Sequence, residues 1–246
     1  MSVASLDHAV WRADQMASCQ AGVVASGHAL LDRELPDGGW PTASLIELLP
    51  QQPGIGEMRL LQPALASIAQ RRRIVLVQPP HAPQTAAWSG WGLAAERLLW
   101  VKTERTADAL WSVEQILRNG SCGAVLFWQT HSRPEALRRL HLAAQAGDAM
   151  FWLLRPLPNA QDASPSPLRL ALQPARGGIA VHVIKRRGPA RDTPLFVPLT
   201  MPARVSPGAA TDDTVIPFNP ISIRHAPVDR LAPAVAASRN AASALV

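Results

Sequence analysis

The sequence has few cysteines and no long apolar run. Only Cys19 and Cys122 occur among 246 residues, 103 positions apart, so a disulfide framework and a cysteine-based zinc site are both excluded. No apolar run approaches the roughly 20 residues that a bilayer-spanning helix needs. Residues 1–10 carry Asp7 and lack the apolar stretch of a secretory signal. We therefore expect a cytoplasmic protein with no membrane segment.

Common catalytic and metal-binding motifs are also missing. The seven histidines form no His-Glu-x-x-His motif and no Cys/His pair with zinc-site spacing. The Gly-x-Ser-x-Gly elbow typical of many serine hydrolases does not occur either. From these absences we expect neither a metal nor a cofactor.

Charge and proline content divide the chain into unequal parts. The whole chain has 24 basic and 18 acidic residues, a net charge of +6. Residues 1–155 hold 14 basic and 13 acidic groups, whereas residues 156–246 hold 10 and 5. The basic excess, which is typical of proteins with a polyanionic partner, is therefore C-terminal. We predict an N-terminal helical segment (1–26), a core (27–199) and an extended, Pro/Ala-rich basic tail (200–246).

Short apolar runs alternate with amphipathic stretches through the core. This pattern is typical of a parallel sheet with crossover helices. A closing pair of runs around residues 174–178 predicts a hairpin instead. The predicted strands cover residues 44–49, 73–78, 98–102, 123–128, 149–154, 168–173 and 179–186, and the predicted helices cover 57–70, 85–96, 106–119 and 134–146.

The turn after the first predicted strand is where an α/β protein would bind phosphate. A working P-loop needs two glycines five apart, a lysine for the phosphates and a hydroxyl for magnesium. With Gly56 as the second glycine, Gln51 stands at the first, Glu57 at the lysine and Met58 at the hydroxyl. The carboxylate would repel phosphate. We therefore predict a degenerate P-loop and no enzyme activity. The residues of the degenerate loop are Gln51, Pro53, Gly54, Gly56, Glu57 and Met58.

Several segments resemble the RecA ATPase core. Residues 27–32 (GHALLD) and 35–41 (LPDGGWP), followed by Glu47, resemble the lead-in to its P-loop strand. The resemblance implies a RecA-like, P-loop NTPase-type fold with a mostly parallel sheet flanked by helices. Pro80 replaces the family's catalytic glutamate, and Trp128 or Gln129 replaces the Walker B aspartate. The nucleotide site is therefore expected to be degenerate, and a live ATPase with an unconventional site is the weaker alternative.

A second resemblance is closer. Residues 78–100, 109–120 and 144–151, with Arg155-Pro156, look like SulA-type cell-division inhibitors and their longer relatives, the ImuA proteins. The strands expected after residue 165 favour the ImuA group.

This resemblance implies a non-catalytic accessory protein of SOS-induced translesion DNA synthesis. Its implied partners are an ImuB-like Y-family polymerase relative and an error-prone replicative-type polymerase, with RecA and DNA as further candidates. The alternative is a SulA-like division inhibitor that binds FtsZ.

Two residue groups are candidate contact sites. Lys185, Arg186 and Arg187 end a predicted strand where RecA carries a basic pair, so we consider them for DNA or partner binding. A solvated strand end explains them equally well. Trp88 and Trp91, on a short predicted helix, are candidates for a protein interface.

Overall fold

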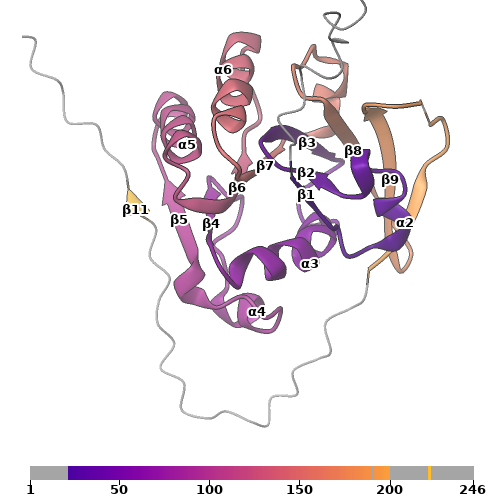
Figure 1. The fold of residues 1–246 in the computed structure, drawn as a ribbon, viewed down its shortest axis with the longest axis horizontal. Helices are drawn as coiled ribbons and strands as arrows, with labels where there is room; N and C mark the ends of the chain where they lie inside the picture. Colours follow the sequence, from indigo (N-terminus) through magenta and orange to yellow (C-terminus); the bar gives the residue numbers. More distant parts are fainter. Residues whose placement is uncertain (1–21, 190, 200–220, 223–246) are drawn as a thin grey trace, which may run out of the picture.

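The computed structural model describes residues 22–189, 191–199 and 221–222. These residues form one large sheet with helices on both faces and a small two-stranded sheet beside it (Figure 1). The helices are α2 (Ala29–Asp32), α3 (Glu57–Ala69), α4 (Thr85–Ser89), α5 (Thr106–Asn119) and α6 (Pro134–Gln145), with 3₁₀ turns η1 (Pro36–Gly38), η2 (Ala95–Arg97) and η3 (Leu157–Gln161).

The large sheet has nine strands in the described residues, ordered β10-β9-β8-β3-β7-β6-β4-β5-β11. Strands β8 to β10 pair antiparallel, and all other neighbours pair parallel. A mixed α/β architecture with a mostly parallel sheet is therefore confirmed. The strands are β3 (Ser44–Pro50), β4 (Arg73–Val77), β5 (Leu98–Lys102), β6 (Cys122–Trp128), β7 (Met150–Leu154), β8 (Leu168–Ala175), β9 (Gly178–Lys185), β10 (Leu195–Pro198) and β11 (Ile221–Ser222).

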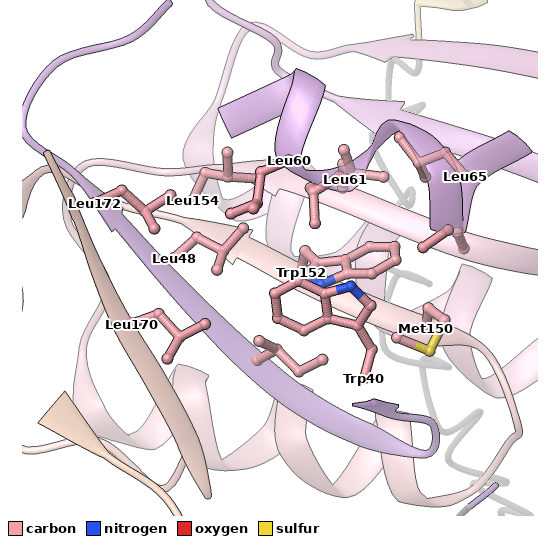
Figure 2. Packing of buried hydrophobic residues seen from close by; sticks show 14 of the residues in the cluster. Trp40, Leu48, Leu60, Leu61, Leu65, Met150, Trp152, Leu154, Leu170 and Leu172 are labelled. Carbon is pink, nitrogen blue, oxygen red and sulfur yellow. The ribbon is translucent and has the colours of Figure 1, made fainter. Parts of the chain in front are cut away.

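Two apolar layers cover the two faces of this sheet. Alternate residues of β3 separate into them, with Leu45 on one side and Leu48 on the other, as the strand period of two requires. The Leu48 side packs against α3 and includes Trp40 and Trp152, whose rings meet edge to face at 5.9 Å (Figure 2). The other layer holds α5 and α6.

Most predicted elements are confirmed, with one clear error. The helix predicted over 85–96 ends at Ser89, because Gly90 and Gly92 follow and Gly92 adopts a left-handed φ of 76°. Pro63, predicted to kink the helix or begin it, lies inside α3. The predicted hairpin is present as β8 and β9, with Pro174 paired to Ile179.

The structure describes only small parts of the predicted N-terminal segment and of the predicted tail. Of the predicted helical segment 1–26, the structure describes only residues 22–26, where β1 (Val23–Val24) pairs with β2 (Trp40–Pro41) instead of forming a helix. Ser26 is fully buried, and its N–H donates to Asp32 Oδ1 at 2.8 Å. The division of the chain into three parts stays a prediction. The predicted tail 200–246 lies outside the described residues except for β11, which pairs parallel with β5.

The order in which strands are added to the sheet reverses between β4 and β6. The strand that follows β4 in the sequence, β5, lies on one side of this pair, and the strand that follows β6, β7, lies on the other side. The connections after β5 and β6 run through α5 and α6 on one face, while α4, after β4, contributes Trp88 to the opposite layer. Ligands of open α/β sheets bind beyond the carboxyl ends of strands at such a switch point. None of the described helices is long and apolar enough to cross a membrane.

Candidate functional site

The loop between β3 and α3 is closed by its own carboxylate. The Gly54 N–H donates to Glu57 Oε1 at 2.8 Å, and the Gly56 N–H donates to Glu57 Oε2 at 3.1 Å. Glu57 is only 3% exposed and begins α3, where a negative charge complements the helix dipole. Two of the backbone donors that would face a phosphate in a P-loop are therefore occupied by this side chain.

Two features hold this loop in shape. Gly56 has a φ of 118°, and a Cβ there would lie 2.8 Å from Leu199 Cδ1, so only glycine fits without displacement. Met58 packs against the core, whereas Pro53 and Gln51 are exposed. The Gln51 N–H donates to Leu172 O at 2.9 Å, which extends the β3–β8 contact. The degenerate loop residues thus lie together, with Glu57 at their centre.

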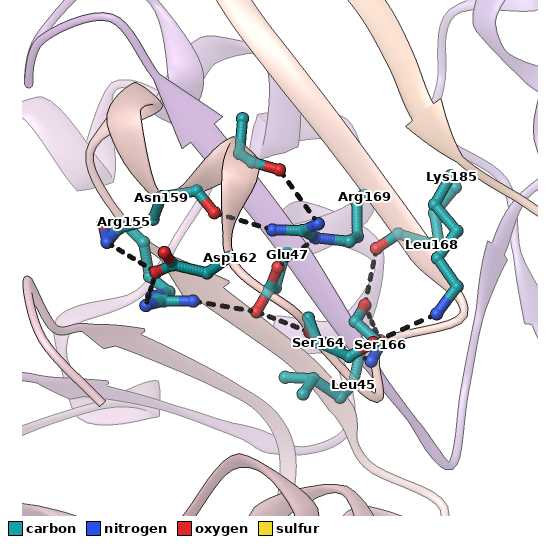
Figure 3. Close-up of polar contacts among 11 residues, drawn as sticks. Leu45, Glu47, Arg155, Asn159, Asp162, Ser164, Ser166, Leu168, Arg169 and Lys185 are labelled. Carbon is teal, nitrogen blue, oxygen red and sulfur yellow. Dashed lines mark hydrogen bonds and ion pairs between the residues drawn. The ribbon is translucent and has the colours of Figure 1, made fainter. Parts of the chain in front are cut away.

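A buried ionic network centred on Glu47 links neighbouring strands of the sheet (Figure 3). Glu47, in β3, is fully buried, and Arg169 Nε donates to its Oε2 at 2.5 Å. Arg155, 1% exposed, donates to Glu47 Oε1 at 3.4 Å and to Asp162 Oδ2 at 3.0 Å. Ser164 Oγ donates to Glu47 Oε1 at 2.9 Å. One carboxylate therefore holds two buried guanidinium groups and joins β3, β8 and the residue that follows β7.

Sequence reasoning missed this network, although a signal was present. Glu47 and Arg169 each interrupt an apolar strand with a charge, and the β3–β8 register places them directly opposite each other. Buried charges are rare unless paired. Two isolated charges of opposite sign in apolar strands therefore predict a pair once strand adjacency is known.

The three basic residues at the end of β9 have different environments. Arg186 donates to Glu34 Oε2 at 2.7 Å and to Glu34 O at 2.7 Å, so it joins the strand end to the turn after α2. Lys185 Nζ donates to Ser164 O at 3.1 Å and remains exposed. Arg187 is exposed as well. Arg186 thus has a structural contact, while Lys185 and Arg187 are accessible to a partner.

Trp88 and Trp91 form a pair with their ring centroids 5.7 Å apart. Trp88 is 7% exposed and belongs to the core layer of α3. Trp91 is half-buried, and its carbonyl accepts from Gln62 Nε2 at 3.3 Å. Of the two predicted interface residues, only Trp91 has substantial surface for a partner.

The described residues hold no group of three or more His, Cys, Asp or Glu side chains arranged to bind a metal. Cys122 is a buried free cysteine at the start of β6, and burial raises the pKa of its thiol to about 11. A thiol with this pKa is protonated at neutral pH and is a poor nucleophile.

Comparison with known proteins relates part of the chain to SulA proteins. No protein-family model matches. A curated relative, "Cell division inhibitor SulA" from Edwardsiella piscicida, is 29% identical over 98 residues, 39% of this chain. The chain spans 58% of that relative's length. The crystal structure of SulA from Pseudomonas aeruginosa matches with a TM-score of 0.40 and 28% identity, covering 47% of this chain and 99% of that one.

The sequence similarity supports SulA-like homology. It does not extend to the finer assignment to the ImuA group, which stays a prediction, as does the RecA-like reading of the loop.

Proposed function

We propose that this protein is a SulA-like inhibitor of cell division that acts by docking on the FtsZ ring protein. The similarity over 98 residues to a curated division inhibitor carries the proposal. The translesion role implied by the ImuA resemblance has no comparable support, so the division inhibitor becomes the main reading.

The proposed activity is binding without nucleotide chemistry. Glu57 takes up the N–H groups of Gly54 and Gly56 within the loop. The loop also lacks the lysine and the hydroxyl that phosphoryl transfer requires. An inhibitor that works by occupying a surface needs neither.

The outer surfaces of α5 and α6 are the proposed contact. Trp111 on α5 is 42% exposed and Leu142 on α6 is 61% exposed. Both lie within residues 88–150, the part of the chain through which the resemblance to SulA-type proteins predicts docking. Exposed aromatic and aliphatic side chains of this kind anchor protein interfaces. Phe196 on β10, 46% exposed, lies outside that span and offers a matched control.

Expression of the full chain in dividing cells tests the proposal. We expect long, undivided filaments, with Trp111→Ala reducing the effect and Phe196→Ala leaving it unchanged. Purified protein should lower FtsZ polymerisation, measured by light scattering. Trp111→Ala should weaken this inhibition, and Phe196→Ala should leave it unchanged. Cells of normal length at a verified high level of folded protein would contradict the proposal.

A second candidate, the ImuA-like accessory protein, is favoured by one observation. Strands β8 to β10 follow Arg155-Pro156 and continue the main sheet, whereas SulA-type chains are expected to stop soon after that pair. The test is deletion of the gene: a loss of damage-induced mutagenesis with normal division would favour this role. Co-purification of an ImuB-like polymerase relative from damaged cells would identify the partner.

A further inference from the structure

A cavity of about 960 Å³ opens beyond the carboxyl ends of β4 and β6. Gln78, which directly follows β4, and the segment 128–133, which ends β6 and leads to α6, line it together with Thr106 at the start of α5. The cavity therefore lies at the switch point of the sheet, where α/β proteins bind ligands.

Two helices begin at this cavity. Helix α5 has 14 residues and α6 has 12, and neither has a side-chain hydrogen bond at its N-cap. A helix N-terminus carries a partial positive charge and unpaired N–H groups, which suit an anion. The first-turn acids Asp108 and Glu135 do not line the cavity.

Buried polar atoms without partners supply an independent observation. Arg155 lines the cavity with a side chain that is 1% exposed, and its Nε has no hydrogen-bond partner among the described residues. Ser132 Oγ, in the loop that lines the cavity, is buried and unpaired within the same part of the chain. Buried polar groups of this kind cost free energy unless something satisfies them.

The charge lining the cavity favours an anion. Arg133, Arg155 and the carboxylate of Asp162 line the cavity. Asp162 accepts hydrogen bonds from Arg155 and Asn159, and Arg155 also pairs with Glu47, so the net positive charge of the lining comes from Arg133. Arg133 is exposed and adds a positive charge at the N-cap of α6. Trp128, half-buried at the end of β6, adds an aromatic surface to the same cavity.

We propose that this cavity binds the phosphate group of a small phosphorylated ligand with an aromatic ring, such as a mononucleotide. The phosphate lies between the N-termini of α5 and α6, within reach of Arg133 and Arg155, and the ring packs on Trp128. This binding does not depend on division inhibition. It also differs from P-loop binding, since Glu57 closes the loop after β3.

Isothermal titration of the full-length protein tests the site, with inorganic phosphate, ribose 5-phosphate, AMP and adenosine as probes at constant ionic strength. We expect AMP to bind more tightly than ribose 5-phosphate or inorganic phosphate, and adenosine not to bind. Arg133→Gln should weaken AMP binding by about tenfold, because it removes one charge-assisted contact. Arg138→Gln, an exposed arginine on α6 outside the cavity, should leave it unchanged.

Each contrary result overturns the proposal. If inorganic phosphate, ribose 5-phosphate and AMP all failed to bind saturably at millimolar concentration, the site would be excluded. Equal loss in the two arginine variants would exclude this cavity as its location. Binding of adenosine as tight as that of AMP would exclude phosphate recognition. Circular dichroism of both variants checks that they fold, which is expected because both side chains are exposed.

Discussion

The loop after β3 and the cavity beyond β4 and β6 both follow carboxyl ends of parallel strands, yet they differ in what satisfies their polar groups. In the loop, the carboxylate of Glu57 accepts from two backbone N–H groups and is almost fully buried. In the cavity, the helix starts lack side-chain caps, and Arg155 Nε has no partner in the described chain.

The difference shows that fold position alone does not make an anion site. Backbone N–H groups that already donate to an internal carboxylate are not available to a phosphate, whose own charge the carboxylate would also repel. A ligand of this protein is therefore better matched to the cavity than to the loop. Three substitutions test which interactions stabilise the two regions, and they are given from the largest expected effect on stability to the smallest.

Glu47→Ala should have the largest effect, because it leaves two buried guanidinium groups without their shared carboxylate. We expect a loss of about 3–5 kcal/mol in the free energy of unfolding, measured in urea. The control Glu34→Ala also removes a carboxylate that pairs with two arginines, Arg186 and Arg191, but at a more exposed position. It should cost about 1 kcal/mol or less. Similar losses in both variants would mean that the buried network does not support the cavity wall.

Glu57→Ala should have an intermediate effect on stability and none on catalysis. Two backbone donors lose their acceptor, which we expect to cost about 1–2 kcal/mol. Glu57→Gln keeps one acceptor oxygen and should lose less. ATP hydrolysis should stay at background in the wild type and in both variants. Hydrolysis by the wild type that Glu57→Ala left unaltered would refute the description of the loop as closed.

His141, on α6, should give the smallest effect, visible as pH dependence. Burial, and secondarily the charge of Lys185, hold the pKa of His141 below its usual 6.5. The folded state therefore resists protonation, so this contribution to stability is present above pH 6.5 and is lost as the pH falls below it. Thermal unfolding at pH 7.5 and 5.5 should show a smaller decrease for His141→Gln than for the wild type. An identical decrease in thermal stability in the two proteins would exclude His141 as a source of the pH dependence.

The local sequence was sufficient to predict most helices and strands. It was not sufficient to predict the hydrogen bonds that hold the candidate sites in shape. The helix over 106–119 is predictable because its apolar face and the terminal Gly120, with a φ of 66°, are local signals. The helix predicted over 85–96 is wrong beyond Ser89, since two glycines outweigh the apolar pattern around Trp88. The unusual residue at the loop, Glu57, was recognised, whereas its hydrogen bonds to Gly54 and Gly56 were not.

By itself, the sequence determined the alternation of strands and helices, the closing hairpin and the replacement of every P-loop side chain, because each of these depends on neighbouring residues and backbone propensity. Only the tertiary structure decided that Glu47 lies opposite Arg169, 122 positions away, and that Arg155 lines the cavity at the switch point. Such contacts depend on which strands become neighbours after crossover connections, and local propensity does not specify that choice.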